Sequence, residues 1–557
     1  MLRWLFLFIL CIFPPLTSAS ERIGVLVVAM DRGAVGNQEL AATVADLDPD
    51  YPVKLLLIGP DYQGIENGYA AYMEAARAFL HEHGVGKVIA IPLFVSEADH
   101  LLGLFRSQIE TAMAPAVLTW TPALGESYLL REILLDRIRS VSKTPAAERL
   151  VLWLSGAGDT GGAATLRSLG ERLLDDIRPF VSFAETEVAL TYSRTAGGPE
   201  AEAAEAETAT LVNRFAEAGR TLIIPSVVGL KFTPNMSLET MLKRRYTHAN
   251  IHIAESVMPH SAVRTWLRRM INRHVPVTKD TIGFIIMPHG STAPYNDGII
   301  AAMPDMVRRY PTAFAFGMAS PFAIGQAVNE LEAAGVRHGV FLRLYAMSHH
   351  FREASDYILG LRMAPPAHNH GGVPERVRTS VRFVTTGGYQ PDPLISEILK
   401  DRILEVSQDP SQESILLLSH GSRSDKANAA DLALITEHNI ATIKAILPAP
   451  FRDIRAMSLR EDWPDKRAEA LREIRAFIEQ ANNGGQAIVI SNRLYGSGSY
   501  GTYLDGLEYV MNGQGLIPHP NFTRWVEKSL REGIAVLKAG AKGQLTEAAV
   551  DHHSTSH

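Results

Sequence analysis

The sequence is almost devoid of cysteine: its 557 residues contain one, Cys11. That residue lies in an apolar N-terminal run. Because it is the one cysteine, the chain after this run has no thiol. A chain without thiols forms no disulfide bonds and offers no thiolate to a metal. A transition-metal site would have to use His, Asp, Glu or Met side chains.

The chain also lacks a strong charge of either sign. It carries 54 Lys and Arg against 60 Asp and Glu, a net charge of −6, and no basic stripe. A nucleic acid is therefore not expected as a partner. The sequence contains no dinucleotide-binding glycine fingerprint, no Walker loop and no His-Glu-x-x-His zinc helix. No organic cofactor is expected.

A run long enough to span a bilayer is missing from the N-terminus. Arg3 precedes an apolar run at 4–13, and the small residues Thr-Ser-Ala follow at 17–19. This order is typical of a secretory signal peptide, here residues 1–19, and the run is shorter than the roughly 20 residues of a membrane span. We expect an exported, periplasmic protein without a stable membrane span after cleavage. An uncleaved N-terminal anchor is the alternative.

What the chain does contain is a fourfold pattern: an apolar strand-like run, a turn of small or polar residues, and a helical pattern. The four runs are 23–29, 150–154, 282–287 and 415–418. A second set of Val, Ile and Leu-rich runs follows at 88–95, 221–228, 339–347 and 487–492. Continuous apolar runs are typical of parallel strands buried on both faces. The sequence predicts an α/β fold of four doubly wound parallel-sheet lobes.

The two halves of the chain resemble each other. Residues 129–138 (LLREILLDRI) and 394–403 (LISEILKDRI) are identical at seven of ten positions. The spacing between these segments equals that between Ser155 and His420 and is close to that between Asp31 and His289. Landmarks at nearly one offset indicate a tandem duplication of a two-lobed unit. The expected boundaries are signal peptide 1–19, lobe 1 at 20–140, lobe 2 at 141–275, lobe 3 at 276–378, lobe 4 at 379–540 and a disordered His-containing tail at 541–557.

Histidines stand where predicted strands end. His289 and His420 follow the first strands of the third and fourth modules, His349 and His350 follow a later strand of the third, and His100 follows its counterpart in the first. In open α/β sheets, ligands bind beyond the carboxyl ends of the strands. Imidazole binds Co²⁺, Ni²⁺, Fe²⁺ or Zn²⁺ and accepts a proton near neutral pH. We therefore predict His289, His349, His350 and His100 as candidate metal ligands.

The residues around these histidines resemble the class II chelatase family, which includes the sirohydrochlorin cobaltochelatases and has the ferrochelatase fold. The resemblance rests on 285–291 (IIMPHGS), 417–423 (LLSHGSR) and 91–96 (IPLFVS) before His100. It implies a cleft in which two histidines bind a divalent metal, Co²⁺, Fe²⁺ or Ni²⁺, as substrate and help to deprotonate a tetrapyrrole. By this resemblance His289 is the first histidine.

The second histidine is His350 by the same resemblance, with His349 as the alternative, while His420 assists from the facing lobe. The first module has Asp31 where the resemblance expects histidine, and the second has Ser155. We therefore expect the catalytic residues His289, His350 and His420 in the second half, and a degenerate first half. A metal pair of Asp31 and His100 remains open.

The other polar and sulfur-containing residues near the motifs are expected to have mainly structural roles. Ser291 and Ser422 are expected to cap helices, and Asn296 and Asn428 are expected to be structural. Arg343, Arg352 and Arg423 are expected in surface salt bridges, with tetrapyrrole carboxylates as the alternative. Met287, Met318 and Met347 are expected in the core, and the tracts His368–His370 and His552–His557 are expected to be solvated.

The leading hypothesis is an exported chelatase that inserts Co²⁺, Fe²⁺ or Ni²⁺ into a sirohydrochlorin-like tetrapyrrole. A non-enzymatic periplasmic carrier of metal or tetrapyrrole is the second hypothesis, and a scaffold for protein contacts is the third. The sequence does not determine the oligomeric state.

Overall fold

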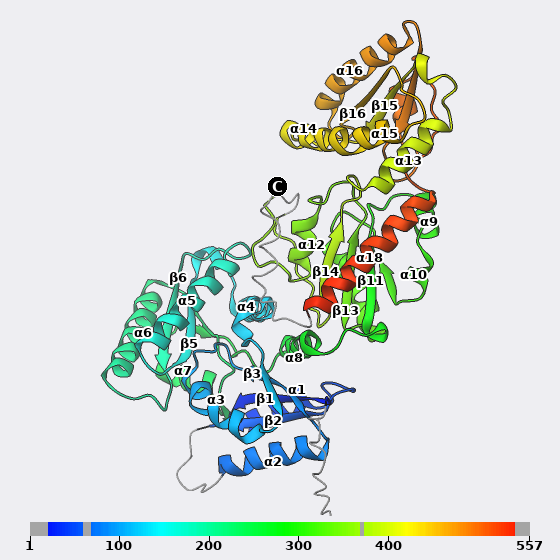
Figure 1. Ribbon diagram of the computed structural model, residues 1–557. Coiled ribbons are helices and arrows are strands. Elements are labelled where there is room, and N and C mark those ends of the chain that lie inside the picture. The colour runs from blue at the N-terminus through cyan, green and yellow to red at the C-terminus, as the bar shows by residue number, and fades with distance from the viewer. Residues whose placement is uncertain (1–20, 60–67, 368–371, 541–557) are drawn as a thin grey trace, which may run out of the picture. The chain divides into compact units, whose positions relative to one another are not determined.

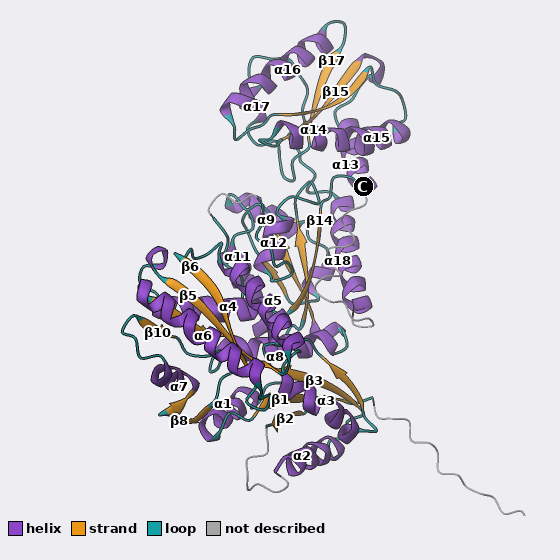
Figure 2. Cartoon of the chain, turned by 90° about the vertical axis from the view of Figure 1, so that its left-hand side faces the viewer, coloured by secondary structure: helices purple, strands orange, loops and turns teal. Residues whose placement is uncertain are grey.

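The computed structural model describes residues 21–59, 68–367 and 372–540. The predicted signal peptide, the His368–His370 tract and the predicted C-terminal tail lie outside these residues. The chain divides into two compact units, Met1–Val275 and Pro276–His557, and each is described by itself. Both consist of parallel strands with helices on their faces (Figures 1 and 2). Within the described ranges, every helix is too short or too polar to cross a bilayer.

Lobe 1 is a four-stranded parallel sheet of order β2-β1-β3-β4. Its strands are β1 (Ile23–Met30), β2 (Val53–Ile58), β3 (Lys87–Leu93) and β4 (Val117–Trp120), and its helices are α1 (Ala34–Val44), α2 (Gly68–Glu82) and α3 (His100–Met113). The interior of β1 is completely buried, as its continuous apolar run predicts for a central parallel strand.

Lobe 2 repeats this order: its sheet reads β6-β5-β7-β10, which are the second, first, third and fourth of these strands along the chain, as in lobe 1. The strands are β5 (Arg149–Ala157), β6 (Glu185–Tyr192), β7 (Thr221–Pro225) and β10 (Ile251–Ile253), with a small hairpin of β8 (Lys231–Thr233) and β9 (Met236–Ser237). The covering helices are α5 (Thr160–Ile177), α6 (Pro199–Ala218) and α7 (Leu238–Arg245).

In the second unit, lobe 3 has the order β12-β11-β13-β14 and lobe 4 the order β16-β15-β17. The strands are β11 (Ile282–Met287), β12 (Thr312–Phe314), β13 (His338–Arg343), β14 (Arg382–Gly387), β15 (Glu413–Ser419), β16 (Asp453–Ser458) and β17 (Gln486–Ser491). The helices are α9 (Ala293–Ala301), α10 (Asp305–Arg308), α11 (Pro321–Ala333), α12 (Arg352–Ile358), α14 (Asp425–Leu434), α15 (Ala441–Ile446), α16 (Pro464–Asn482) and α17 (Tyr500–Tyr503).

The helices that join the lobes cross over and do not follow the predicted boundaries. In the first unit, α4 (Tyr128–Val141) contacts β7 and α5 of lobe 2, whereas α8 (Ser261–His274) returns to β3 and α1 of lobe 1. Arg264 of α8 donates a hydrogen bond to the Ala45 carbonyl of lobe 1 at 2.7 Å, and Arg268 donates one to the Leu47 carbonyl at 2.9 Å. Each lobe is therefore covered by a helix that ends the sequence range predicted for the other lobe.

The second unit repeats the exchange, which corrects the predicted end of lobe 3 at residue 378. Strand β14 lies beyond that residue and pairs with β13. Helix α13 (Pro393–Leu404) contacts β17 of lobe 4, whereas α18 (Pro520–Gly540) returns to cover β13 and β14 of lobe 3. Thr523 at its start donates a hydrogen bond to the Ala302 carbonyl at 3.0 Å. Sequence order alone does not reveal such a return, because an amphipathic helix does not encode which sheet it covers.

One contact is repeated at the same place in both units. Arg137 of α4 donates a hydrogen bond to the carbonyl of Pro259, just before α8, at 2.6 Å. Arg402 of α13, which aligns with Arg137 in the repeated segment, donates one to the carbonyl of Pro518, just before α18, at 2.7 Å. The repeated contact and the repeated strand order are consistent with a tandem duplication.

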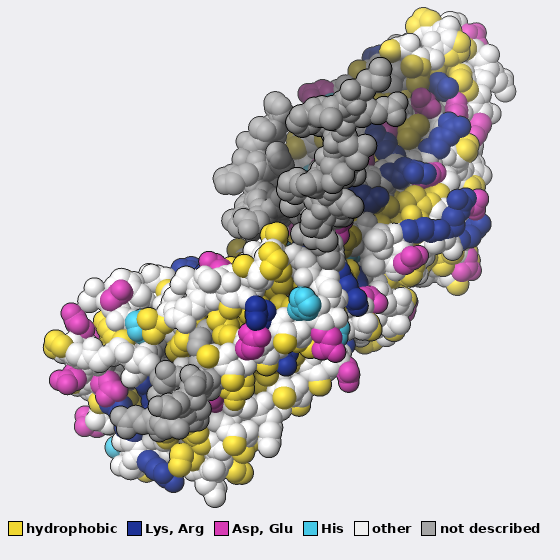
Figure 3. Space-filling model, turned by 60° about the horizontal axis from the view of Figure 1, so that its bottom comes forward, with side chains coloured by type: hydrophobic (Ala, Val, Ile, Leu, Met, Phe, Trp, Pro, Cys, Tyr) yellow, Lys and Arg dark blue, Asp and Glu magenta, His cyan; other side chains and the backbone are white. Residues whose placement is uncertain are grey.

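On the face drawn in Figure 3, acidic and basic side chains are interspersed over the described surface.

Candidate metal centre

The loop after β13 carries two adjacent histidines, His349 and His350. The Arg343 guanidinium at the end of β13 holds this loop: its Nη1 donates hydrogen bonds to the carbonyl oxygens of Ser348 at 2.6 Å and His350 at 3.1 Å. Arg343 is only 2% exposed, and burial lowers its pKa to about 10, which leaves it charged at neutral pH. The expected surface salt bridge of Arg343 is therefore wrong, and its role is to position the histidine loop.

A carboxylate from lobe 4, that of Asp431, lies beside these two histidines. Asp431 lies on α14, and its Oδ2 accepts a hydrogen bond from the Ser422 hydroxyl at 2.7 Å. Ser422 was expected to cap this helix, but the capping residue is Ser424. The Ser422 hydroxyl orients the carboxylate of Asp431 instead.

His349, His350 and Asp431 offer ligand atoms that all lie within 4.8 Å of one another. The Nε2 atoms of His349 and His350 are each 3.8 Å from an oxygen of Asp431. Two atoms that are each about 2.1 Å from one ion lie at most about 4.2 Å apart, so the two separations of 3.8 Å from Asp431 fit a shared ion. Two imidazoles and one carboxylate leave coordination positions open and suit ferrous iron, cobalt or nickel.

The protonation states of the group favour a cation. Burial opposes ionisation of Asp431, but the nearby imidazole of His350 and the hydrogen bond from Ser422 outweigh it, and the pKa of the carboxyl is lowered. Burial, and then the neighbouring His350, lower the pKa of His349. A metal ligand must be an ionised carboxylate or a neutral imidazole, so both shifts keep these side chains ready to bind at neutral pH.

Comparison with known proteins identifies the family. Over 132 residues, the chain is 31% identical to the sirohydrochlorin cobaltochelatase of Methanothermobacter thermautotrophicus, a match that covers 22% of this chain and 92% of that protein. The chain belongs to the class II chelatase family. No protein-family model matches the chain.

Two solved structures resemble this class II chelatase at lower similarity. SirB from Bacillus subtilis, determined with Fe³⁺, has a TM-score of 0.31 and 16% identity, over 45% of this chain and 95% of SirB. The multi-domain protein DR2241 from Deinococcus radiodurans, described as structurally similar to chelatases, has a TM-score of 0.28 and 15% identity, over 57% of this chain and 80% of DR2241.

The other predicted histidines of this chelatase stand outside the three-residue group. His289 is exposed at the end of β11, with Nδ1 2.8 Å from the Gly290 carbonyl. A carbonyl only accepts, so Nδ1 carries the hydrogen and Nε2 is left as an acceptor. The described residues contain one such group, and His289 is not in it. That group has three members, so the sharing of one ion by the pair His289 and His350 stays a prediction. Within the group, the imidazole of His349 and the carboxylate of Asp431 accompany His350.

His420 and His100 are committed to contacts with their own surroundings. The Nε2 of His420 lies 3.2 Å from Asp462, and its ring meets Trp463 edge-on. His100 begins α3, and its ring packs so closely on Gly158 that a Cβ there would be 2.2 Å from Nδ1. Neither belongs to a three-ligand group within the described ranges.

Asp31 shapes its own turn. Its Oδ1 accepts hydrogen bonds from the Gly33 N–H at 2.8 Å and the Asn37 amide at 2.9 Å. Asp31 and His100 are not part of any three-ligand group that the described residues form. The alternative of a metal pair of Asp31 and His100 in lobe 1 stays open.

The structural expectation for the two motif asparagines is confirmed, whereas the capping expectation for Ser291 is wrong. Asn296 and Asn428 accept hydrogen bonds from the backbone N–H of Ser291 and Ser422, each at 3.1 Å. Thr292 occupies the capping position that was expected of Ser291.

The methionine and remaining arginine expectations have mixed outcomes. Met287 and Met347 are buried, whereas Met318 is 58% exposed and its expected place in the core is wrong. Met318 follows the short edge strand β12, where the chain has already left the sheet. Arg352 lies 3.6 Å from Asp356 on its own helix, and Arg423 is exposed.

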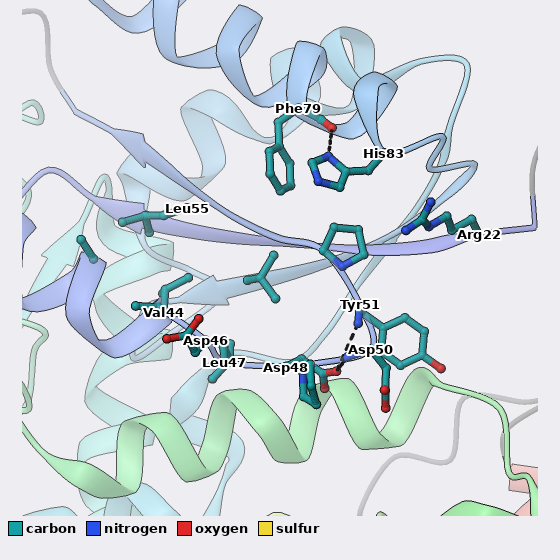
Figure 4. Close-up of a pocket in the computed structure, with 15 residues that line it drawn as sticks. Arg22, Val44, Asp46, Leu47, Asp48, Asp50, Tyr51, Leu55, Phe79 and His83 are labelled. Carbon is teal, nitrogen blue, oxygen red and sulfur yellow. Dashed lines mark hydrogen bonds between the residues drawn. The ribbon is translucent and has the colours of Figure 1, made fainter.

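A surface pocket of about 520 Å³ lies at the opposite, amino-terminal ends of β1 and β2 (Figure 4). Asp48 accepts hydrogen bonds there from the backbone of Asp50 and Tyr51 at 2.9 and 3.3 Å, and His83 donates to the Phe79 carbonyl at 2.8 Å. The Asp48 contacts shape the turn between α1 and β2, and the His83 contact lies at the end of α2, so the pocket is a structural feature of these two segments.

Asp99 gives the first unit a pH-dependent stability. It caps α3 and lies against Gly156 of lobe 2, where a Cβ would be 2.4 Å from its Oδ2. Burial raises the pKa of Asp99 from 3.8 to about 7. The folded state therefore binds the proton more tightly than the unfolded state, so stability falls as the pH rises from about 4 to about 7 and then stays level.

We expect the thermal midpoint of the first unit to fall between pH 5 and pH 8, and Asp99→Asn to fall less, because asparagine can cap α3 but does not ionise. The difference is a few kcal/mol at most, since one pKa unit corresponds to about 1.4 kcal/mol. Calorimetry at both pH values measures it. Asp159→Asn, at the exposed capping position of α5, is the matched control. Wild-type pH dependence in the Asp99 variant would contradict the assignment.

Proposed function

We propose that this chain is a metal chelatase that inserts a divalent ion, Co²⁺, Fe²⁺ or Ni²⁺, into a sirohydrochlorin-like tetrapyrrole. The observation that carries the proposal is the convergence of His349, His350 and Asp431 from two lobes. Membership of the class II chelatases and the similarity to a sirohydrochlorin cobaltochelatase support it.

The group is suited to releasing the metal as well as to binding it. The side chains of His349 and His350 are 64% and 30% exposed, whereas that of Asp431 is 11% exposed. An ion held by the buried carboxylate would therefore meet an incoming macrocycle on its imidazole side. Three protein ligands leave open positions through which pyrrole nitrogens can replace water.

Metal insertion also requires two pyrrole protons to leave. In this proposal the exposed His289 accepts one through Nε2, the nitrogen that its bond to Gly290 leaves free, and the imidazole of His350 accepts the other as it releases the ion. His289 is thus assigned to proton transfer and not to metal binding. His420, held by Asp462, is assigned an orienting role in the facing lobe.

The test is a metal-dependent change in the absorbance of sirohydrochlorin when the purified full-length chain and Co²⁺, Fe²⁺ or Ni²⁺ are added. We expect the His349→Ala/His350→Ala variant to show no metal-dependent absorbance change in its initial rate. The control is His438→Ala, at an exposed histidine of the neighbouring segment Ile435–Ile440, which is expected to keep the wild-type rate. Equal rates in the double variant and wild type would reject the site. Stoichiometric binding of metal or tetrapyrrole without product would instead identify a carrier.

We further propose that the chain is exported and cleaved after Ala19. The supporting feature is the sequence pattern of residues 1–19. Mass spectrometry of the protein from a periplasmic fraction is expected to find Ser20 as the first residue. Recovery of the uncleaved chain, with Met1–Ala19 still attached, in the membrane fraction would favour the uncleaved anchor.

A further inference from the structure

A buried network of side-chain amides lies where lobe 3 meets lobe 4. Gln390 follows β14 of lobe 3, whereas Asn439 and Asn492 belong to lobe 4, and the three residues are 1%, 0% and 5% exposed. The Gln390 amide donates to Oδ1 of Asn439 at 2.9 Å, and Asn492 donates to Oε1 of Gln390 at 3.2 Å. The two lobes are therefore joined by specific hydrogen bonds as well as by apolar packing.

The contact between Gln390 and Asn439 is reciprocal. The Nδ2 of Asn439 donates to the backbone carbonyl of Gln390 at 2.7 Å and to the Ser396 hydroxyl at 3.0 Å. A carbonyl oxygen only accepts, so this bond determines the orientation of the Asn439 amide. A buried polar network whose members all have partners holds its elements in one arrangement, and apolar side chains at these positions would not specify the arrangement in this way.

At one end of the network, Gln390 is attached to the histidine loop. Its backbone N–H donates to the carbonyl of Ala346 at 2.9 Å, three residues before His349. Two residues earlier, Gly388 lies so close to this loop that a Cβ there would be 2.4 Å from the Cα of Ser348. A displacement of Gln390 would therefore displace the loop that carries both histidines.

At the other end, Asn439 lies on the helical run that carries Asp431. Helix α14 continues directly into the π-helical segment Ile435–Ile440, which contains Asn439. In an α-helix, residues eight positions apart point about 80° away from each other around the axis. The wider π turn reduces this angle, so that Asp431 and Asn439 both face lobe 3. Single π turns within α-helices occur frequently at functional sites.

The first unit provides an internal comparison. Gly125 and Gln390 each lie four residues before the repeated segment. The Gly125 N–H donates to the Val95 carbonyl at 2.9 Å, as that of Gln390 does to Ala346. A Cβ at Gly125 would lie 2.1 Å from the Val95 oxygen and 3.0 Å from Leu169, so this position cannot carry an amide. Among the described residues, the three-ligand group occurs only in the unit that has Gln390.

We propose that Gln390 and Asn439 are positioning residues that hold Asp431 at coordinating distance from His349 and His350. The amide pair touches neither the metal nor the tetrapyrrole, and acts by fixing lobe 4 against the histidine loop. This role rests on the proposed function, which assigns the metal to those three side chains. Residues that orient metal ligands typically contribute 10–100-fold to metal affinity.

The first test is calorimetric titration of the full-length chain with Co²⁺. In Gln390→Met/Asn439→Leu, side chains of similar size replace both amides, which is expected to cost little stability because both partners are removed together. We expect the Kd for Co²⁺ to rise about tenfold. The control is Asn482→Leu in α16, which removes an amide that bridges Ala487 and Glu508 within lobe 4. This control is expected to keep the wild-type Kd.

A double-mutant cycle distinguishes positioning from a general structural role. If the amide pair acts through Asp431, replacing it in an Asp431→Asn background should raise the Kd less than about twofold, because that ligand is already impaired. A general loss of structure would instead weaken binding by the same factor in both backgrounds. Gln390→Met alone keeps the bond from Asn439 to the backbone carbonyl at position 390. It is expected to raise the Kd about threefold, and it serves if the double replacement fails to fold.

The second test needs no metal. Spin labels are attached to Phe322→Cys on α11 and Arg472→Cys on α16, both exposed positions, in a Cys11→Ser background that removes the one native thiol. Pulsed electron resonance in EDTA then measures the distance between lobes 3 and 4. We expect one narrow distribution with the amide pair intact, and a broader or shifted one in Gln390→Met/Asn439→Leu.

Two results would overturn the positioning role: the same distance distribution with and without the amide pair, or an equal loss of Co²⁺ affinity in both backgrounds of the cycle. Wild-type affinity in Gln390→Met/Asn439→Leu would overturn this role alone and leave the proposed function standing. If the unaltered chain bound no Co²⁺, the proposed function and the positioning role would fail together.

Discussion

Replacing Asp431 with asparagine is expected to raise the Kd for Co²⁺ about 100-fold at neutral pH. The substitution removes the negative charge that lies 3.8 Å from both imidazoles but keeps an oxygen that can accept from the Ser422 hydroxyl. Loss even of a residue that only orients a metal ligand typically costs 10–100-fold in affinity. A lost anionic ligand belongs at the upper end, about 2.7 kcal/mol.

Calorimetric titration with Co²⁺, in the absence of tetrapyrrole, measures this change. The matched control is Asp462→Asn, which removes a carboxylate 3.2 Å from His420 in the same lobe, outside the three-residue group. We expect the control to bind Co²⁺ with wild-type affinity. Equal weakening in both variants would mean that general negative charge, and not coordination, attracts the ion.

The strands and the histidine loop were predictable because each rests on a local pattern. A parallel strand covered on both faces has to be apolar throughout, and β1, β5, β11 and β15 each read as such a run. The loops after β11 and β13 begin at the same edge of one parallel sheet, and this placed His289, His349 and His350 at strand ends. What the pattern did not determine is which of these rings meet.

Asp431 was missed because its role depends on contact between two lobes. One local signal was available: Asp431, Ile435 and Asn439 recur at every fourth position and are all buried. A polar residue on the buried face of a helix needs a partner. Asn439 finds one in Gln390, whose amide donates to it at 2.9 Å, and Asp431 finds the histidine loop.

A cavity of about 660 Å³, lined by residues of both lobes of the first unit, was missed for a related reason. The first half was expected to be degenerate because it lacks the histidines of the motifs, and missing histidines indicate only the absence of a metal site. The apolar residues that line the cavity, such as Trp153 and Met241, are indistinguishable in sequence from core residues. Only the arrangement of the two sheets separates a wall from a core.

The exchanged helices lead to a second large effect, in stability. Phe522 of α18 is fully buried, with its ring 6.0 Å from that of Tyr389 and 5.5 Å from that of Trp525. We expect Phe522→Ala to lower the free energy of unfolding of the second unit by about 3–5 kcal/mol, the usual cost of removing a buried aromatic ring. Val536→Ala, at a 52% exposed position of the same helix, is expected to change it by less than about 0.5 kcal/mol.

Hydrogen exchange distinguishes this from a local effect on the terminal helix. Gly533 of α18 lies so close to β13 that a Cβ there would be 2.5 Å from Val340. Loosening the helix should therefore expose the amides of β13 and β14, although all of lobe 4 separates these strands from α18 in the sequence. Since β13 ends at Arg343, which holds the histidine loop, Co²⁺ binding should also be lost at a lower temperature. If only the amides of α18 exchange faster and Co²⁺ binding keeps its thermal limit, α18 is not part of the lobe that supports the metal centre.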